Sequence, residues 1–113
     1  MISIQMVPFS EGGTMHTVIR RYQGVVNADE VARRAVEEFA PQLREHPGFQ
    51  GYWVVDSGGG VLATITVFES EESAADSTAA AATWVQENMP NLVPNAPQVT
   101  AGTTTGVAAE VPA

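Results

Sequence analysis

Few side chains of this protein are candidates for catalysis or ligand binding, because cysteine and lysine are absent and all five Lys or Arg positions are arginine. Arg20 and Arg21 are consecutive in a segment of strand character, so their side chains must point to opposite faces of a sheet. An arginine that faces inward can hold an enolate or carboxylate oxygen. The other interpretation is an arginine at an edge or a subunit interface, paired there with a glutamate. The sequence leaves open which of the two faces inward.

Three aromatic residues are candidates for a pocket. Trp53 lies at the centre of an expected strand, and Trp84 lies in an alanine-rich expected helix. If that helix covers the sheet face that carries Trp53, the two indoles line a pocket in which the alanines leave room for a flat ligand. The alternative is that both indoles are core packing. Tyr22 is either a hydrogen-bond donor or acid–base group, or a ring packed in the core.

The composition excludes several classes of function. Without cysteine the chain has no disulfide, zinc–thiolate site, iron–sulfur cluster or thiol nucleophile. The net charge of -8 repels nucleic-acid backbones and anionic membrane surfaces. His16 and His46 are far apart without a flanking carboxylate pattern, which argues against a metal site. We expect a cytoplasmic protein that uses no cofactor and binds neither nucleic acid nor membranes.

Strand and helix signals alternate along the chain. Strands are expected at residues 15–24, 49–56, 61–68 and 98–107, and helices at 27–46 and 70–89. Asn27 or Asp29 caps the first helix, Ser70 caps the second, and Pro41 predicts a kink or restart inside the first. The order β-α-β-β-α-β is that of a ferredoxin-like α+β fold, with two helices on one face of a four-stranded antiparallel sheet.

The strand expected at 61–68 has two different faces. One is apolar and the other is mixed: Val61, Ala63, Ile65 and Val67 alternate with Leu62, Thr64, Thr66 and Phe68. Two helices in a chain of this length cover only one face of the sheet. A second copy of the chain is the simplest cover for the other face, so this strand predicts a homodimer.

The regular pattern spans residues 15–108, which we interpret as one domain. Residues 1–14 form an N-terminal extension, interrupted by Pro8 and a glycine pair at 12–13. This extension is either extraneous, with Met15 as the true start, or an arm that pairs with a sheet edge or swaps between copies. Residues 109–113 are expected to form a C-terminal tail.

The junction between the first helix and the second strand has a recognisable pattern. Glu45-His46-Pro47-Gly48-Phe49, followed by Gly51-Tyr52, resembles the PGF-x-G-Y turn of the dimeric α+β barrel superfamily, and of its antibiotic biosynthesis monooxygenase (ABM) domain family in particular. Residues 67–74 are similar to the strand, acidic turn and helix start of that family. The likeness covers about residues 15–108 in element order, and its short motifs report on the fold more than on catalysis.

The resemblance implies a homodimer whose two sheets close a barrel. Members of the superfamily include cofactor-independent oxygenases of aromatic compounds and haem-degrading enzymes. The haem-degrading branch uses a histidine on the second helix and a tryptophan near the third strand. This chain has no histidine in that helix and has Thr64 and Thr66 in that strand, which argues against haem degradation.

Two hypotheses follow from these observations. The first is an ABM-like homodimer that acts as a cofactor-independent monooxygenase of a flat aromatic or quinone-like metabolite. Its candidate pocket consists of Trp53, Trp84, Tyr22 and one of Arg20 and Arg21. The second is a non-catalytic dimeric barrel that binds a small molecule or serves as an assembly module.

Overall fold

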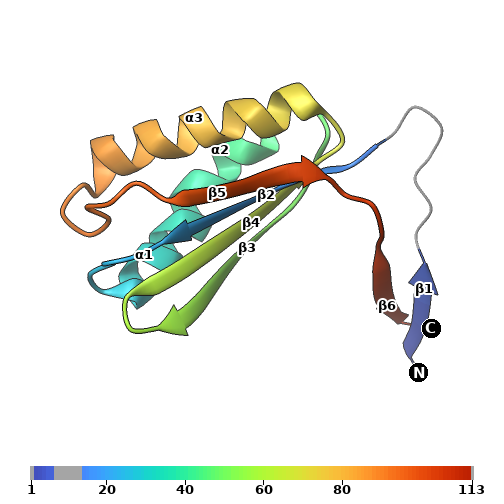
Figure 1. Cartoon of the computed structure of the whole chain (residues 1–113), viewed down its shortest axis with the longest axis horizontal. Helices are drawn as coiled ribbons and strands as arrows, with labels where there is room; N and C mark the ends of the chain where they lie inside the picture. The colour runs from blue at the N-terminus through green and yellow to red at the C-terminus, as the bar shows by residue number, and fades with distance from the viewer. Residues whose placement is uncertain (1, 7–13, 113) are drawn as a thin grey trace.

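The computed structural model describes residues 2–6 and 14–112, and its main element is a four-stranded antiparallel sheet with helices on one face (Figure 1). The strand order in this sheet is β3-β4-β2-β5. Its strands are β2 (His16–Tyr22), β3 (Phe49–Gly58), β4 (Val61–Phe68) and β5 (Gln98–Thr103). The ferredoxin-like α+β fold predicted from the sequence is confirmed. The last strand ends at Thr103, earlier than expected, where it pairs with His16 at the start of β2.

The first helical segment is interrupted where Pro41 predicts a kink. It consists of α1 (Ala28–Arg34), a π-helical turn η1 (Ala35–Phe39) and α2 (Ala40–Arg44). Asn27 caps α1, and its side chain accepts a hydrogen bond from Glu30 N. The Ala40 N–H bonds to Ala35 O, five residues back, and Pro41 then lies in the first turn of α2, where no donor is required.

The second helix, α3 (Glu71–Asn88), lies across the same face of the sheet (Figure 1). Ser70 caps it as expected, since its hydroxyl accepts a hydrogen bond from Ser73 N at 3.2 Å. The side of α3 that meets the sheet carries small residues and one large one: Ser73, Ala74, Ser77, Ala81 and Trp84 are buried. Small side chains let the helix approach the sheet closely. No helix among the described residues is long and apolar enough to cross a membrane.

The turn between α2 and β3 depends on Gly48. Its φ is +77°, a left-handed conformation that side chains rarely adopt, and a Cβ there would lie 3.1 Å from Glu69 N. Glu69 N also donates a 2.8 Å hydrogen bond to Gly48 O. The Pro47-Gly48-Phe49 sequence therefore fixes a close contact between this turn and the end of β4.

The helices cover the mixed face of β4 and leave its apolar face half-exposed. Leu62, Thr64, Thr66 and Phe68 are buried, whereas Val61, Ala63, Ile65 and Val67 are only partly covered. The polar members of the buried face, Thr64 and Thr66, imply a polar contact inside the core. The uncovered apolar face agrees with the sequence argument that something further covers the sheet.

A second, two-stranded sheet pairs the ends of the described chain. β1 (Ile2–Met6) and β6 (Ala108–Pro112) are antiparallel and extend beyond the main sheet, away from the helices (Figure 1). The extension and the tail expected from the sequence thus contribute one strand each. Residues 7–13, which include Pro8 and the glycine pair, lie outside the described residues.

Candidate active site

Arg20 is a cation buried between the sheet and α3. It lies on the same face of β2 as Val18 and Tyr22, and only 1% of it is exposed. Three hydroxyls accept hydrogen bonds from its guanidinium: Thr66 Oγ1 on β4 at 3.2 Å, and Ser77 Oγ and Thr78 Oγ1 on α3 at 2.6 and 3.2 Å. These bonds satisfy the two terminal nitrogens and orient the guanidinium plane.

Among residues 14–108, no carboxylate forms an ion pair with this cation. The ion pairs among residues 14–108 join Arg33 or Arg34 to glutamates of their own helical segment, and none includes Arg20. Burial lowers the pKa of Arg20 below its usual value through desolvation, yet a guanidinium stays charged at neutral pH. A buried positive charge costs free energy unless a negative group, in the protein or in a ligand, compensates it.

Two tyrosines lie beside Arg20 and are kept in the neutral form. Desolvation raises the pKa of Tyr22 and, more strongly, that of Tyr52, although the positive charge of Arg20 opposes both shifts. At neutral pH both phenols are therefore hydrogen-bond donors and not bases.

A cavity of about 260 Å³ lies next to Arg20 and Tyr22. Its other walls come from α3 and from the segment 90–97, which carries three prolines; Ala82, Val85, Pro94 and Val99 are among the lining residues. Two hydrogen bonds hold this segment in place: Val26 N to Leu92 O at 2.8 Å and Asn95 Nδ2 to Gln23 O at 3.1 Å. The wall opposite α3 is therefore rigid and largely apolar.

A second, much smaller cavity lies between the sheet and the two helical segments that cover it. Its volume is about 30 Å³, and Arg20, Tyr22, Val85 and Val93 line it as well as the larger cavity. Tyr52, Thr64, Phe39 and Trp84 complete its polar and aromatic lining. It is too small for a ring and has the size of one or two water molecules.

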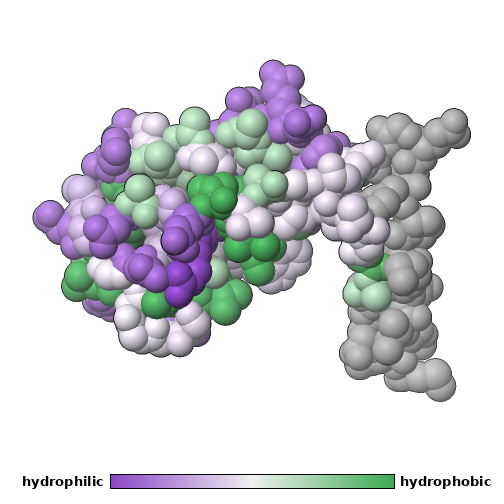
Figure 2. Space-filling view, in the orientation of Figure 1, coloured by the Kyte–Doolittle hydropathy of each residue, from purple (hydrophilic) through white to green (hydrophobic). Residues whose placement is uncertain are grey.

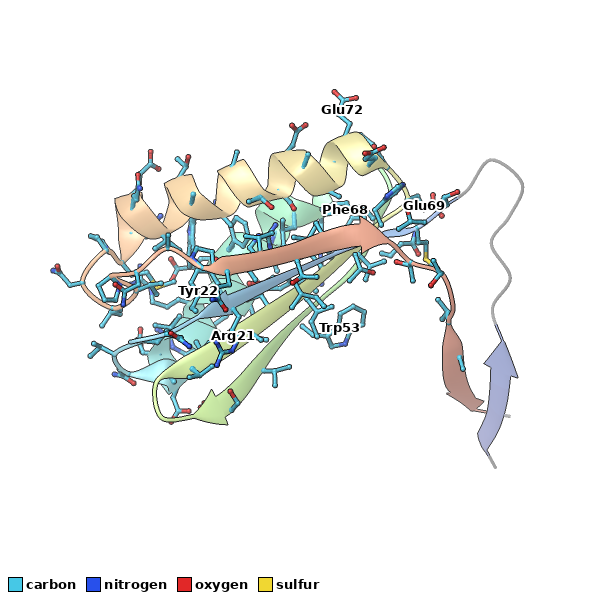
Figure 3. All side chains as sticks on the ribbon, viewed as in Figure 1. Arg21, Tyr22, Trp53, Phe68, Glu69 and Glu72 are labelled. Atoms are coloured by element: carbon cyan, nitrogen blue, oxygen red, sulfur yellow. The ribbon has the colours of Figure 1, made fainter. Side chains whose placement is uncertain are left out.

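Three of the five predicted pocket residues come together, and two do not. Arg20, Tyr22 and Trp84 all line the inner cavity. Trp84 is also buried against Phe39, with ring centroids 5.3 Å apart, so it serves as core packing too. Arg21 points to the opposite face, where it reaches Gln98 at 3.5 Å (Figure 3). The packing of α3 on one face of the sheet thus resolves which of the two arginines faces inward.

The interpretation in which Trp53 and Trp84 share a pocket is corrected by the structure. Trp53 is 54% exposed and lies on the side of the sheet away from α3 (Figure 3). On β3 it is Tyr52 and Val54 that line the inner cavity, so the residue between them must face outward. The Trp53 ring lies over Gly51, where a Cβ would be 2.5 Å from Cη2. This glycine of the turn motif therefore makes room for an indole on the outer face.

The hydroxyl residues around Arg20 were missed by the sequence reasoning. Ser77 and Thr78 interrupt an alanine-rich helix, and Thr64 and Thr66 alternate within an otherwise apolar strand. Polar residues at positions that the periodicity marks as buried were the available signal. Among the described residues, no group of three or more histidine and carboxylate side chains lies together as a metal site.

Comparison with solved structures finds several proteins of similar fold. A protein of unknown function from Nitrosomonas europaea has a TM-score of 0.65 at 16% identity, over 91% of this chain and 99% of its own. The monooxygenase ActVA-Orf6 of Streptomyces coelicolor, solved with nanaomycin D, has a TM-score of 0.61 at 20% identity, over 84% and 89%. SnoaB, a cofactor-independent oxygenase from Streptomyces nogalater, has a TM-score of 0.54 at 15% identity, over 80% and 91%.

The chain has the α+β fold of these ABM-like structures. The resemblance seen in the PGF-x-G-Y turn is thereby confirmed at the level of structure. Neither a family model nor a curated protein sequence matches the chain. Within the ABM-like fold, the cavities at Arg20 lie between the sheet and its helical layer, and the outer face of the sheet is the side that Trp53 occupies.

Proposed function

We propose that this chain is a cofactor-independent monooxygenase of a flat aromatic or quinone-like metabolite and that it works as a homodimer. The observation that carries the proposal is the apolar cavity of about 260 Å³ that ends at a buried cation, Arg20, and a neutral phenol, Tyr22. An aromatic ring fits between α3 and the proline-rich wall, and its polar edge then meets these two donors. Structures of similar fold include cofactor-independent oxygenases.

In such a reaction the substrate supplies the reducing electrons. For an anthrone-type substrate, a CH₂ group is oxidised to C=O: both C–H bonds break, one atom of dioxygen becomes the carbonyl oxygen and the other leaves as water. The first step is loss of a proton to give an electron-rich anion. The protein positions the ring, excludes water and stabilises the negative oxygen through Arg20 and the Tyr22 hydroxyl.

One observation favours the alternative of a binding protein without catalysis. The lining of the two cavities contains no carboxylate and no imidazole, so no general base is built into it. The oxygenase therefore requires a substrate acidic enough to lose its proton to water once Arg20 stabilises the anion. A binding protein needs no such property of its ligand.

Oxygen uptake with an anthrone-type substrate tests the proposal. Ala82 is exposed on α3 and lines the larger cavity, so A82W fills the cavity without touching the core. Ala79 is exposed on the same helix but lines a groove on its other side, which makes A79W the matched control. We expect uptake by the natural chain and by A79W, and loss of at least about tenfold in A82W. Ligand binding without oxygen uptake would favour the binding protein.

The homodimer is proposed from the uncovered face of the sheet. Ile19, Trp53 and Val55 are exposed there, beside the half-buried apolar residues of β4. Figure 2 shows apolar side chains among polar ones on the face of the sheet below α3. Several exposed apolar side chains gathered on one face are typical of a subunit interface. A second copy of the chain presents the same face and covers it symmetrically.

Sedimentation at micromolar concentration tests the dimer. Val55 is 45% exposed on β3, and Val36 is 53% exposed on η1, so the same substitution compares two equally accessible valines. We expect V55E to sediment as a monomer and V36E as a dimer, because only the first places a charge in the proposed interface. A dimer in V55E, or a monomer in the natural chain, would rule out this face as the interface.

A further inference from the structure

Two buried polar atoms next to the inner cavity have no hydrogen-bond partner: Arg20 Nε and Thr64 Oγ1. They are the unpartnered buried side-chain atoms found among residues 14–108. Both residues line the cavity of about 30 Å³. Unsatisfied buried polar atoms are rare, and each costs free energy comparable to a lost hydrogen bond.

The two atoms belong to one cross-strand pair. Arg20 on β2 lies directly opposite Thr64 on β4 in the antiparallel ladder, and both side chains point to the helix side of the sheet. Directly opposed residues have their Cβ atoms about 5 Å apart. Because both residues also line the same cavity of about 30 Å³, one small group in it can reach both Arg20 Nε and the Thr64 hydroxyl.

The chemistry of the pair selects an acceptor with negative charge. Arg20 Nε is only a donor, and the Thr64 hydroxyl can donate as well. Within residues 14–108 the charge on Arg20 has no carboxylate partner, and the phenols of Tyr22 and Tyr52 that line the same cavity are neutral donors. Four donors around a space that holds one or two oxygen atoms form a receptor for an anionic oxygen.

We propose that Arg20 Nε and the Thr64 hydroxyl bind one ionised oxygen of the ligand, so that the ligand class is a flat aromatic acid: a phenol, an enol or a carboxylic acid bound as its anion. The inner cavity takes the oxygen, and the adjoining larger cavity takes the ring. The inference rests on the ligand cavity of the proposed function but does not depend on any reaction with dioxygen.

Direct binding tests the inference with two probes of the same ring system and similar shape, one anionic and one neutral. 2-Naphthoate and 2-naphthamide have the same ring system, and titration calorimetry or fluorescence of Trp84, which lines the cavity, follows their binding. We expect naphthoate to bind at least about tenfold more tightly than the amide, because charge-assisted hydrogen bonds are about twice as strong as neutral ones. Equal affinities would mean that the two atoms hold water only, and would overturn the inference.

Thr64→Val is the decisive variant, because it removes the hydroxyl and keeps the shape of the side chain. Its matched control is Thr100→Val, since Thr100 is exposed on β5 and lies outside both cavities. We expect T64V to lose several-fold in affinity for naphthoate, with little change for the amide and with an unchanged or higher melting temperature. Equal loss for both probes would indicate altered packing and contradict the inference.

The ionisation of a bound phenol gives an independent readout. The absorbance of 2-naphthol reports its deprotonation, and a receptor for the anion must move that transition to lower pH on binding. We expect this shift with the natural chain and a smaller one with T64V. If the shift is seen but no anthrone is oxidised, the anion site stands and the oxygenase fails. If anthrones are oxidised without any preference for anions, the oxygenase stands and the anion site is overturned.

Discussion

Arg20 Nη2 donates a 2.6 Å hydrogen bond to Ser77 Oγ, and this bond joins the central strand β2 to the helix α3. The Ser77 hydroxyl in turn donates to Ala74 O at 2.7 Å, within its own helix. The Ser77 hydroxyl thus donates its proton to the helix backbone, and its oxygen accepts the hydrogen bond from the Arg20 guanidinium. One small side chain therefore holds both the helix position and the orientation of the buried cation.

Removing this serine should destabilise the chain. We expect Ser77→Ala to lower the free energy of unfolding in urea by about 1.5–3 kcal/mol, the range for hydrogen bonds to charged groups. Ser73 is buried one turn earlier on α3 and makes no bond to Arg20, so Ser73→Ala is the matched control. An equal loss of unfolding free energy in the two variants would show that the Arg20–Ser77 hydrogen bond adds no stability beyond that of a buried serine.

Stability should fall at alkaline pH. Burial raises the pKa of Tyr22 and Tyr52 above the value of 10.0 expected in the unfolded chain. Above that pH the unfolded state loses phenolic protons that the folded state keeps, so rising pH favours unfolding. Each tyrosine contributes a slope of up to about 1.4 kcal/mol per pH unit, fully present until its folded pKa is reached.

Urea unfolding from roughly pH 9 to pH 11.5 measures this slope. Tyr52→Phe removes the more strongly shifted phenol and should reduce the fall, whereas the curve below pH 9 keeps its shape. The same slope with and without Tyr52 would mean that its phenol titrates alike in the folded and unfolded states.

A side chain at Gly48, in the turn before β3, should destabilise the fold. We expect Gly48→Ala to cost about 1–2 kcal/mol, because the residue has a φ of +77° and an added Cβ would lie 3.1 Å from Glu69 N. Gly102 on β5 has no positive φ and nothing within 4 Å of an added Cβ, so Gly102→Ala is the control. Thermal melts of the two variants should differ by several degrees; a shared small change would contradict the assignment of strain to the turn.

Truncation decides between the two interpretations of residues 1–14. β1 pairs with β6 beyond the main sheet, and an isolated two-stranded sheet is marginally stable. We expect removal of residues 1–14 to leave the melting temperature of the remaining domain within a few degrees. Sedimentation of the truncated chain then tests its assembly: an intact dimer marks the extension as dispensable, and dissociation identifies it as an arm that joins two copies.

Much of the fold could be predicted because each element carries its own local signal. The caps at Asn27 and Ser70, the break before Pro41 and the turn at Gly48 are all decided by residues within a few positions of one another. The choice of the arginine that enters the site could not be predicted in this way. Alternation requires Arg20 and Arg21 to face opposite ways, but only the packing of α3 decides which direction is inward.

The sequence by itself determined the element order, the ferredoxin-like α+β fold and the two different faces of β4, since all three depend on local patterns. Only the tertiary structure decided which face the helices cover. They cover the mixed face, because Ser77 and Thr78 on α3 bond the buried Arg20 and Trp84 packs on Phe39, and Trp53 and the apolar face of β4 are left outside. Arg20 is a buried cation beside a cavity because it forms hydrogen bonds to residues far away in the chain. Periodicity in the sequence cannot reveal such bonds.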